Sequence, residues 1–106
     1  MEKLYPFLFE PNLHAIVWGG KRLCPYKGLP LDDAPIGESW EGSAVPSSTS
    51  VISNGAFAGQ LLTDVLSRFP EAILGDAVAK KYGNQLPLLV KFIDAEPVDK
   101  TIYYPK

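Results

Sequence analysis

The spacing of apolar residues changes near residue 60, and this change constrains the fold more than any other feature. Before it, short stretches alternate between apolar and polar residues, as in strands whose side chains point to opposite faces. After it, apolar residues recur at the spacing of one helix face: Leu61, Leu62, Val65, Leu66 and Phe69. The sequence therefore predicts strands combined with a helical segment at about residues 60–82.

Glycine and proline divide this helical segment. Pro70 suits the first position of a second short helix, which Gly75 would end. Asp76 could cap a third helix, ended by the Tyr82-Gly83-Asn84 turn. We therefore expect three consecutive helices.

Two stretches before the helices are typical of strands. His14–Trp18 is β-prone and ends at Gly19-Gly20, with His14, Ile16 and Trp18 on one face. Ile36–Ser43 alternates, so that Glu38 projects on the same side as Trp40. A carboxylate and an indole are thus expected together.

The remaining early segments predict connections. Leu4–Phe9 suits an edge strand or an extended lead-in, because a proline lies inside it. Lys21–Pro35 contains Gly28 and several prolines, and it predicts a loop without regular structure. Val51-Ile52 is a β-prone pair between turn signals, which favours a hairpin or meander.

Leu86–Ala95 is a nearly continuous apolar run of strand length, which predicts burial on both faces. Lys91 interrupts it. A desolvated ammonium is stable only with partners or in a wet pocket, and such a pocket would attract an anionic ligand. The alternative is a lysine that extends from a strand end to solvent.

Support for a functional role is weaker for each of the other candidate residues when it is considered alone. Glu38, Trp40 and Trp18 belong to residue types that commonly line pockets for sugar hydroxyls and ring faces. Their ordinary interpretation is a solvated carboxylate and packed indoles. His14 has no carboxylate or cysteine near it in sequence, so a surface or packing role is favoured.

Composition excludes several classes of function. The chain has 106 residues, is 46% hydrophobic and 21% charged, and carries a net charge of −2, which fits one folded domain without a basic stripe for nucleic acid. Cys24 is the single cysteine and His14 the single histidine, so together they cannot form a four-ligand structural zinc site. Neither a signal-peptide core nor a membrane-spanning run is present, which predicts a cytoplasmic location.

Four segments, taken in order, resemble a known family. They are Ile16-Val17-Trp18-Gly19-Gly20, Ile36-Gly37-Glu38-Ser39-Trp40, the stretch from Ser50 to Gly55, and the Leu86–Ala95 run. Over about residues 5–95 the chain resembles type I mannose-6-phosphate isomerases of the bacterial kind. No single segment is diagnostic, but the ordered set with its spacing is specific.

The resemblance implies a cupin-type fold, of which this chain would be the N-terminal portion: mainly β with helices (α+β), part of a jelly-roll β-sandwich. It implies interconversion of mannose 6-phosphate and fructose 6-phosphate, with one bound zinc ion in the full-length enzyme. A proton moves between C1 and C2 of the opened sugar through an enediolate, whose charge cations stabilise. By position, Trp18, Glu38 and Lys91 correspond to substrate-binding residues, with Lys91 facing an anionic group.

The chain departs from the family after the Lys-x-x-Asp-Ala segment. The family continues with a Gln-x-His-Pro motif that ligates zinc, followed by a Glu and a second His, whereas Asp99–Lys106 contains neither Gln nor His. A later catalytic arginine is also missing. The resemblance therefore implies no catalytic residue and no complete metal site here. We expect residues 1–106 to form one partial domain with an unmatched tail at 96–106.

These observations leave three interpretations. The first is a truncated mannose-6-phosphate isomerase that is inactive alone. The second is a non-catalytic sugar-phosphate-binding or protein-interaction module that keeps Lys91 and Glu38. The third is a mixed sheet-and-helix domain that associates, with itself or another chain, through the exposed edge of its last strand.

Overall fold

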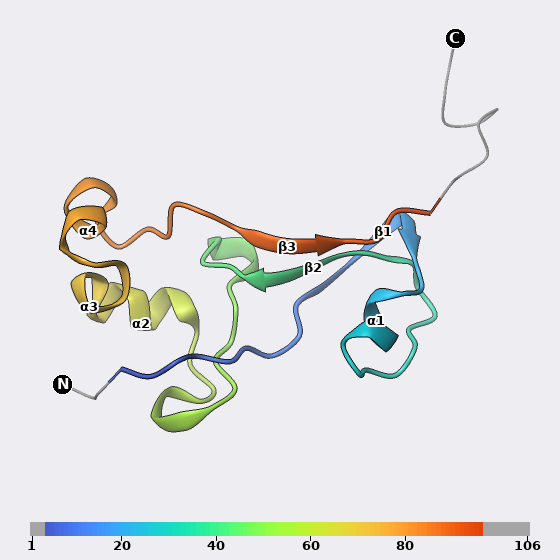
Figure 1. The fold of residues 1–106 in the computed structure, drawn as a ribbon, viewed down its shortest axis with the longest axis horizontal. Helices are drawn as coiled ribbons and strands as arrows, with labels where there is room; N and C mark the ends of the chain where they lie inside the picture. The colour runs from blue at the N-terminus through green and yellow to red at the C-terminus, as the bar shows by residue number, and fades with distance from the viewer. Residues whose placement is uncertain (1–3, 97–106) are drawn as a thin grey trace, which may run out of the picture. The chain divides into compact units, whose positions relative to one another are not determined.

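A computed structural model describes residues 4–96 of the chain, and Figure 1 shows the order of its elements. Within this range the strands β1 (Leu13–Gly20), β2 (Ile36–Gly42) and β3 (Val90–Ile93) form one sheet in the order β1-β2-β3. The α-helices are α1 (Leu23–Tyr26), α2 (Leu62–Arg68), α3 (Pro70–Leu74) and α4 (Asp76–Tyr82), and the 3-10 helices are η1 (Pro46–Ser48) and η2 (Gly55–Phe57). Beyond Glu96, the predicted tail lies outside the described residues.

The chain divides into two compact units. Of the described residues, unit 1 comprises 4–12 and Trp40–Val90, and unit 2 comprises Leu13–Ser39 and 91–96. The boundaries fall within β2 and β3, so each of these strands runs from one unit into the other. The two units are described separately below.

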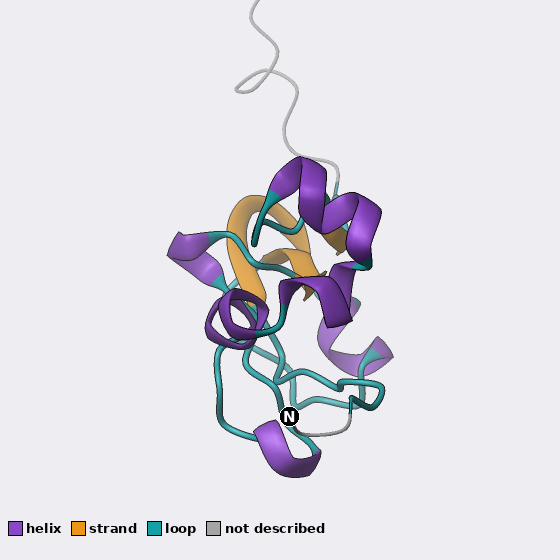
Figure 2. Ribbon diagram, turned by 90° about the vertical axis from the view of Figure 1, so that its left-hand side faces the viewer, coloured by secondary structure: helices purple, strands orange, loops and turns teal. Residues whose placement is uncertain are grey.

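Unit 1 contains the three consecutive helices that the apolar spacing predicts, labelled α2, α3 and α4 in Figure 1, and Figure 2 distinguishes helices from strands by colour. Leu62, Val65 and Leu66 are the buried residues of α2. Pro70 is the first residue of α3, while Gly75 and Gly83 take positive φ angles of 83° and 67° at the helix ends. The predicted helical segment at about 60–82, and with it an α+β fold, is confirmed.

The core of unit 1 is aromatic. Ile52 and Val65 are completely buried and Phe57 is 3% exposed. Partly buried rings from the N-terminal segment and from α2's end pack on them: Tyr5, Phe7, Phe9 and Phe69. The Tyr5 hydroxyl donates to the Asn54 carbonyl (2.8 Å) and accepts from the Phe57 N–H (2.9 Å), so its polar end is satisfied within this core.

The expected hairpin or meander around Val51-Ile52 takes the form of isolated antiparallel pairs. Ile52 pairs with Phe9 of the lead-in segment, and Val51 pairs with Leu61 just before α2. The Val51–Leu61 pair is a local antiparallel return of the chain, whereas Phe9 comes from a distant part of the sequence, which local turn signals cannot specify.

Unit 2 is built around close approaches between backbone segments. A Cβ atom at Gly19 would lie 2.4 Å from the Gly37 nitrogen, and one at Gly20 would lie 2.5 Å from Oδ2 of Asp94. Only glycine allows contacts this short. A small buried cluster of Leu23, Cys24 and Ile36 completes the interior of this unit.

Two predictions fail in unit 2 and at its border. The expected loop at 21–35 contains helix α1, where Leu23 and Cys24 are buried against Ile36. The expected strand at 86–95 shortens to β3, and all four of its residues are exposed. Burial on both faces needs covering layers, and among residues 4–96 the edge-on contact of the Tyr26 ring with Phe92 leaves β3 exposed.

A helix that crosses a membrane must be long and apolar. Among the described helices, none has the length and apolar character required to cross a bilayer.

Candidate functional site

An ion pair joins β2 and β3 at Lys91, the charged residue that interrupts the apolar run. The Lys91 Nζ of β3 donates to Oε1 of Glu38 in β2 over 3.2 Å. The Lys91 side chain is 35% exposed and that of Glu38 is 14% exposed. The structure therefore gives Lys91 a charged partner, and it leaves part of the Lys91 side chain accessible to solvent.

The position of Glu38 depends on an irregularity in the pairing of β1 with β2. His14 pairs with Glu38, whereas the next residue, Ala15, pairs with Ile36. Gly37 is therefore an extra residue in β2, which makes this a β-bulge. Bulges bend a strand, increase its twist and redirect side chains, and they are common beside active sites.

The indole of Trp18 lies against this bulge. A Cβ atom at Gly37 would be 2.9 Å from Cζ3 and 3.1 Å from Cη2 of Trp18. The absence of a side chain at Gly37 thus makes room for the ring. Trp18, Glu38 and Lys91, the three predicted substrate-binding residues, all lie in unit 2, where Trp18 contacts Gly37 and Lys91 contacts the adjacent Glu38.

These three side chains offer complementary contacts to a ligand. An ammonium has three donors and a positive charge for an anionic group. A carboxylate accepts hydrogen bonds from hydroxyls, and an indole offers an apolar face with one N–H donor. Each of these residue types could therefore contribute one contact to a small anionic polyol.

A second ion pair, which the sequence did not point to, lies at the end of β3. Oδ1 of Asp94 accepts from Nε of Arg22 (2.7 Å) and lies 2.5 Å from its Nη2, while Oδ2 accepts from the Arg22 backbone N–H (2.9 Å). The Asp94 side chain is only 5% exposed. The one sequence signal was the acidic residue that ends an apolar run.

Electrostatics follow from this geometry. The hydrogen bond from the Arg22 side chain, followed by the one from its backbone N–H, lowers the pKa of the Asp94 carboxyl below its ordinary value. In the other direction, the hydrogen bond to Asp94 and its charge raise the pKa of Arg22. Both groups are therefore charged at neutral pH.

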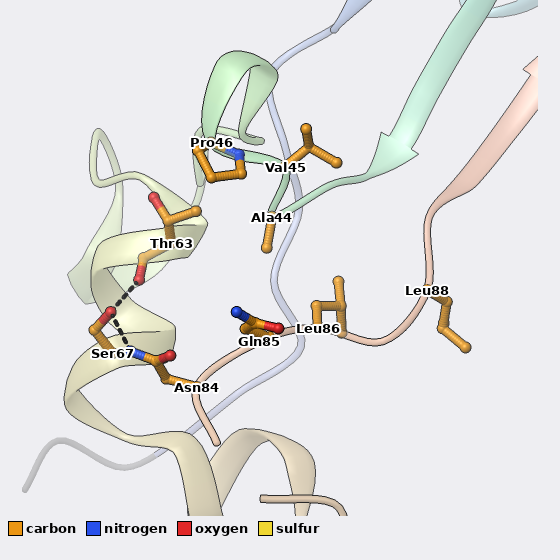
Figure 3. A pocket seen from close by; sticks show the side chains of 9 residues that line it. All are labelled: Ala44, Val45, Pro46, Thr63, Ser67, Asn84, Gln85, Leu86 and Leu88. Carbon is orange, nitrogen blue, oxygen red and sulfur yellow. Dashed lines mark hydrogen bonds between the residues drawn. The ribbon is translucent and has the colours of Figure 1, made fainter. Parts of the chain in front are cut away.

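Unit 1 has a groove of its own, with a volume of about 470 Å³ (Figure 3). Its lining combines apolar and neutral polar residues: Ala44, Val45, Pro46, Thr63, Ser67, Asn84, Gln85, Leu86 and Leu88. The Ser67 hydroxyl donates to the Thr63 carbonyl (2.9 Å) and accepts from Asn84 Nδ2 (3.1 Å). No charged residue lines this groove, so it lacks the cation that an anionic ligand would need.

The zinc ion that the resemblance implies can be tested against the residues present. Across residues 4–96, no group of three or more His, Cys, Asp or Glu side chains could hold a metal ion. The described residues therefore do not fit a zinc centre.

Comparison with known proteins gives a consistent result. A family model described as phosphomannose isomerase type I, catalytic domain, matches residues 7–102. Mannose-6-phosphate isomerase of Streptococcus mutans is 31% identical over 90 residues, covering 85% of this chain and 27% of that protein. Mannose-6-phosphate isomerase ManA of Bacillus subtilis is 28% identical over 91 residues, covering 86% of this chain and 27% of that protein.

Structural comparison agrees with the sequence matches. The crystal structure of the mannose 6-phosphate isomerase from Bacillus subtilis superposes with a TM-score of 0.71 at 29% identity, covering 85% of this chain and 27% of that one. The chain thus spans about 27% of the length of the curated relatives it matches.

Proposed function

Since residues 7–102 match its model, this chain belongs to the phosphomannose isomerase type I catalytic domain family, and we propose that it supplies one wall of the substrate pocket of a mannose-6-phosphate isomerase. Its α+β fold corresponds to the N-terminal portion of these isomerases and agrees with part of a cupin fold. The reaction proposed for the whole domain is interconversion of mannose 6-phosphate and fructose 6-phosphate. Zinc and a cytoplasmic location remain predictions.

The observation that carries this proposal is the Lys91–Glu38 pair at 3.2 Å in unit 2. A lysine in an apolar strand run, held by a carboxylate yet 35% exposed, is placed to meet an anion from solvent. A sugar phosphate supplies the anion together with hydroxyls, which suit Glu38. No basic patch is needed for so small a ligand.

Each residue has a distinct proposed role. Lys91 attracts the anionic part of the substrate and stabilises negative charge that develops nearby. Glu38 orients the ammonium and accepts a hydrogen bond from a sugar hydroxyl, and Trp18 packs against the sugar. None of them is proposed to move the proton between C1 and C2. Because the resemblance places the metal ligands and a catalytic arginine outside the matched segments, residues 1–106 are proposed to be inactive alone.

Titration of the purified chain with mannose 6-phosphate, in the presence of a chelator, tests the pocket. We expect saturable binding that weakens about tenfold in Lys91→Ala, the loss typical of one charge-assisted hydrogen bond. Lys80→Ala is the matched control, because Lys80 is an exposed lysine of α4 and unit 1. Equal affinity in both variants, or no binding by the unmodified chain, would contradict the proposal.

A coupled assay with zinc and mannose 6-phosphate tests the second part. We expect no turnover above the buffer rate from residues 1–106. Clear turnover would show that the chain is a complete catalyst, whereas binding without turnover agrees with a pocket wall and also with a non-catalytic sugar-phosphate-binding module.

A specific observation favours protein association as a second candidate function. β3 is the last strand in the order of the described sheet, and Val90, Phe92 and Ile93 are 51%, 42% and 60% exposed. An apolar edge strand is a template for pairing with another strand. We propose a second copy of the chain as the occupant. Sedimentation analysis should then give a dimer that Ile93→Lys dissociates, and a monomer at all concentrations would refute it.

A further inference from the structure

Asp94 is the most tightly held residue at the end of β3. Its carboxylate accepts hydrogen bonds from the Arg22 side chain (2.7 Å) and the Arg22 backbone N–H (2.9 Å). Its own N–H donates to the Gly37 carbonyl (2.9 Å), and its carbonyl accepts from the Gly20 N–H (3.1 Å). One residue is thus joined to the end of β1, to the start of α1 and to β2.

The surroundings of Asp94 are shaped to admit this carboxylate. A Cβ atom at Gly20 would lie 2.5 Å from Oδ2 of Asp94, so any larger residue there would displace it. Arg22 also lies 3.4 Å from the exposed carboxylate of Glu96, but Glu96 is 47% exposed whereas Asp94 is 5% exposed. The buried member of this group is therefore Asp94.

Neither burial nor the Lys91–Glu38 ion pair by itself sets the register of β3 against β2, whose backbones are hydrogen-bonded to each other. All residues of β3 are exposed, so burial does not determine which residue of β3 faces which residue of β2. A partly exposed ion pair such as Lys91–Glu38 contributes little to stability. In a weakly specified strand, a slip of one residue turns every side chain to the other face.

The bond from Asp94 N–H to the Gly37 carbonyl lies one residue from Glu38 and three residues from Lys91. We propose that Asp94, held by Arg22, is a positioning residue that fixes the register of β3 against β2 and so places the Lys91 ammonium beside Glu38. This inference rests on the proposed function for the role of that pair, but the placement itself can be measured without substrate.

The test uses the 106-residue chain, labelled for NMR, and measures the nuclear Overhauser effect between the Lys91 ε-protons and the Glu38 γ-protons. Asp94→Asn keeps the size of the residue but loses the charge that holds the guanidinium. We expect the effect to become about fivefold weaker in Asp94→Asn, because the register is no longer fixed. Glu96→Gln, which removes the exposed partner of Arg22, should leave it unchanged.

Arg22→Ala is the second variant, in case Asp94→Asn does not fold. It removes the guanidinium but keeps the backbone N–H that binds Oδ2 of Asp94. If Arg22→Ala weakens the Overhauser effect less than Asp94→Asn does, and Arg22→Lys restores it, Asp94 has a positioning role. An effect of full strength in a folded Asp94→Asn or Arg22→Ala variant would overturn the inference.

The outcome is separable from the proposed function. If the Overhauser effect weakens as expected while mannose 6-phosphate fails to bind the unmodified chain, Asp94 is a positioning residue and the ligand assignment is wrong. If mannose 6-phosphate binds and the Overhauser effect does not depend on Asp94, the proposed pocket is supported and the positioning role of Asp94 is refuted.

Discussion

The interiors of unit 1 and unit 2 differ in the size of their apolar cores. Unit 1 has an aromatic and aliphatic core, in which Ile52 and Val65 are completely buried. Among its described residues, unit 2 buries a small apolar cluster around Leu23, and hydrogen bonds made with Asp94 and close glycine contacts join its segments. Apolar burial stabilises without direction, whereas hydrogen bonds and backbone contacts fix positions. The candidate site lies in the unit with the smaller apolar core.

The largest expected effect tests the core of unit 1. Phe57 is 3% exposed and contacts the rings of Tyr5, Phe7 and Phe69. Phe57→Ala should lower the free energy of unfolding by about 3–5 kcal/mol, because it leaves a cavity. Urea denaturation followed by circular dichroism measures the loss.

Phe92→Ala in unit 2 is the matched control for that change. Phe92 is 42% exposed, so its loss should cost about 1 kcal/mol or less. Similar losses in the two variants would mean that the units do not differ in how they are stabilised.

The next effect concerns the bulge in unit 2. A methyl group at Gly37 would lie 2.9 Å from the Trp18 ring, so Gly37→Ala should lower the free energy of unfolding by about 1–3 kcal/mol. Trp18 fluorescence should shift as the indole moves. Gly42→Ala, where nothing lies within 4 Å, is the control and should change neither quantity.

A smaller effect is expected from pH. The pKa of Asp94 is lowered in the folded chain, below an ordinary value of about 3.9 in the unfolded one. The resulting stability is present above the unfolded pKa and is lost as pH falls through the folded pKa. The urea midpoint should therefore fall on acidification below about pH 4, and this fall should be smaller in Asp94→Asn.

Asp33→Asn removes an exposed aspartate of the same unit and serves as the control. If the urea midpoint of Asp94→Asn falls on acidification as far as that of Asp33→Asn, the Arg22–Asp94 pair does not stabilise unit 2.

The smallest effect is expected in the groove of unit 1. Ser67→Ala removes the hydroxyl that joins the Thr63 carbonyl to Asn84. Because Ser67 is exposed, the free energy of unfolding should fall by about 0.5–1 kcal/mol. Ser47→Ala, at an exposed serine of η1, should be neutral, and thermal unfolding compares the two. A loss as large as that of Phe57→Ala would show that unit 1 also depends on polar contacts.

The sequence specified the elements whose signals are local. The spacing from Leu61 to Phe69, together with Pro70, Gly75 and Gly83, predicted α2, α3 and α4, because helical spacing and helix ends are set by residues a few positions apart. The strands near His14 and Ile36 were predicted for the same reason. Lys91 was identified because a charge interrupts an apolar run.

Only the tertiary structure decided how these elements meet. The partner of Lys91 is 53 residues away and that of Arg22 is 72 residues away, and no periodicity spans such distances. The exposure of β3 also escaped prediction, since an apolar run reveals what a strand can bury but not whether another layer covers it. Register, partner and covering layer are long-range properties, whereas the sequence by itself determined the helices after residue 60, the α+β class and the family resemblance.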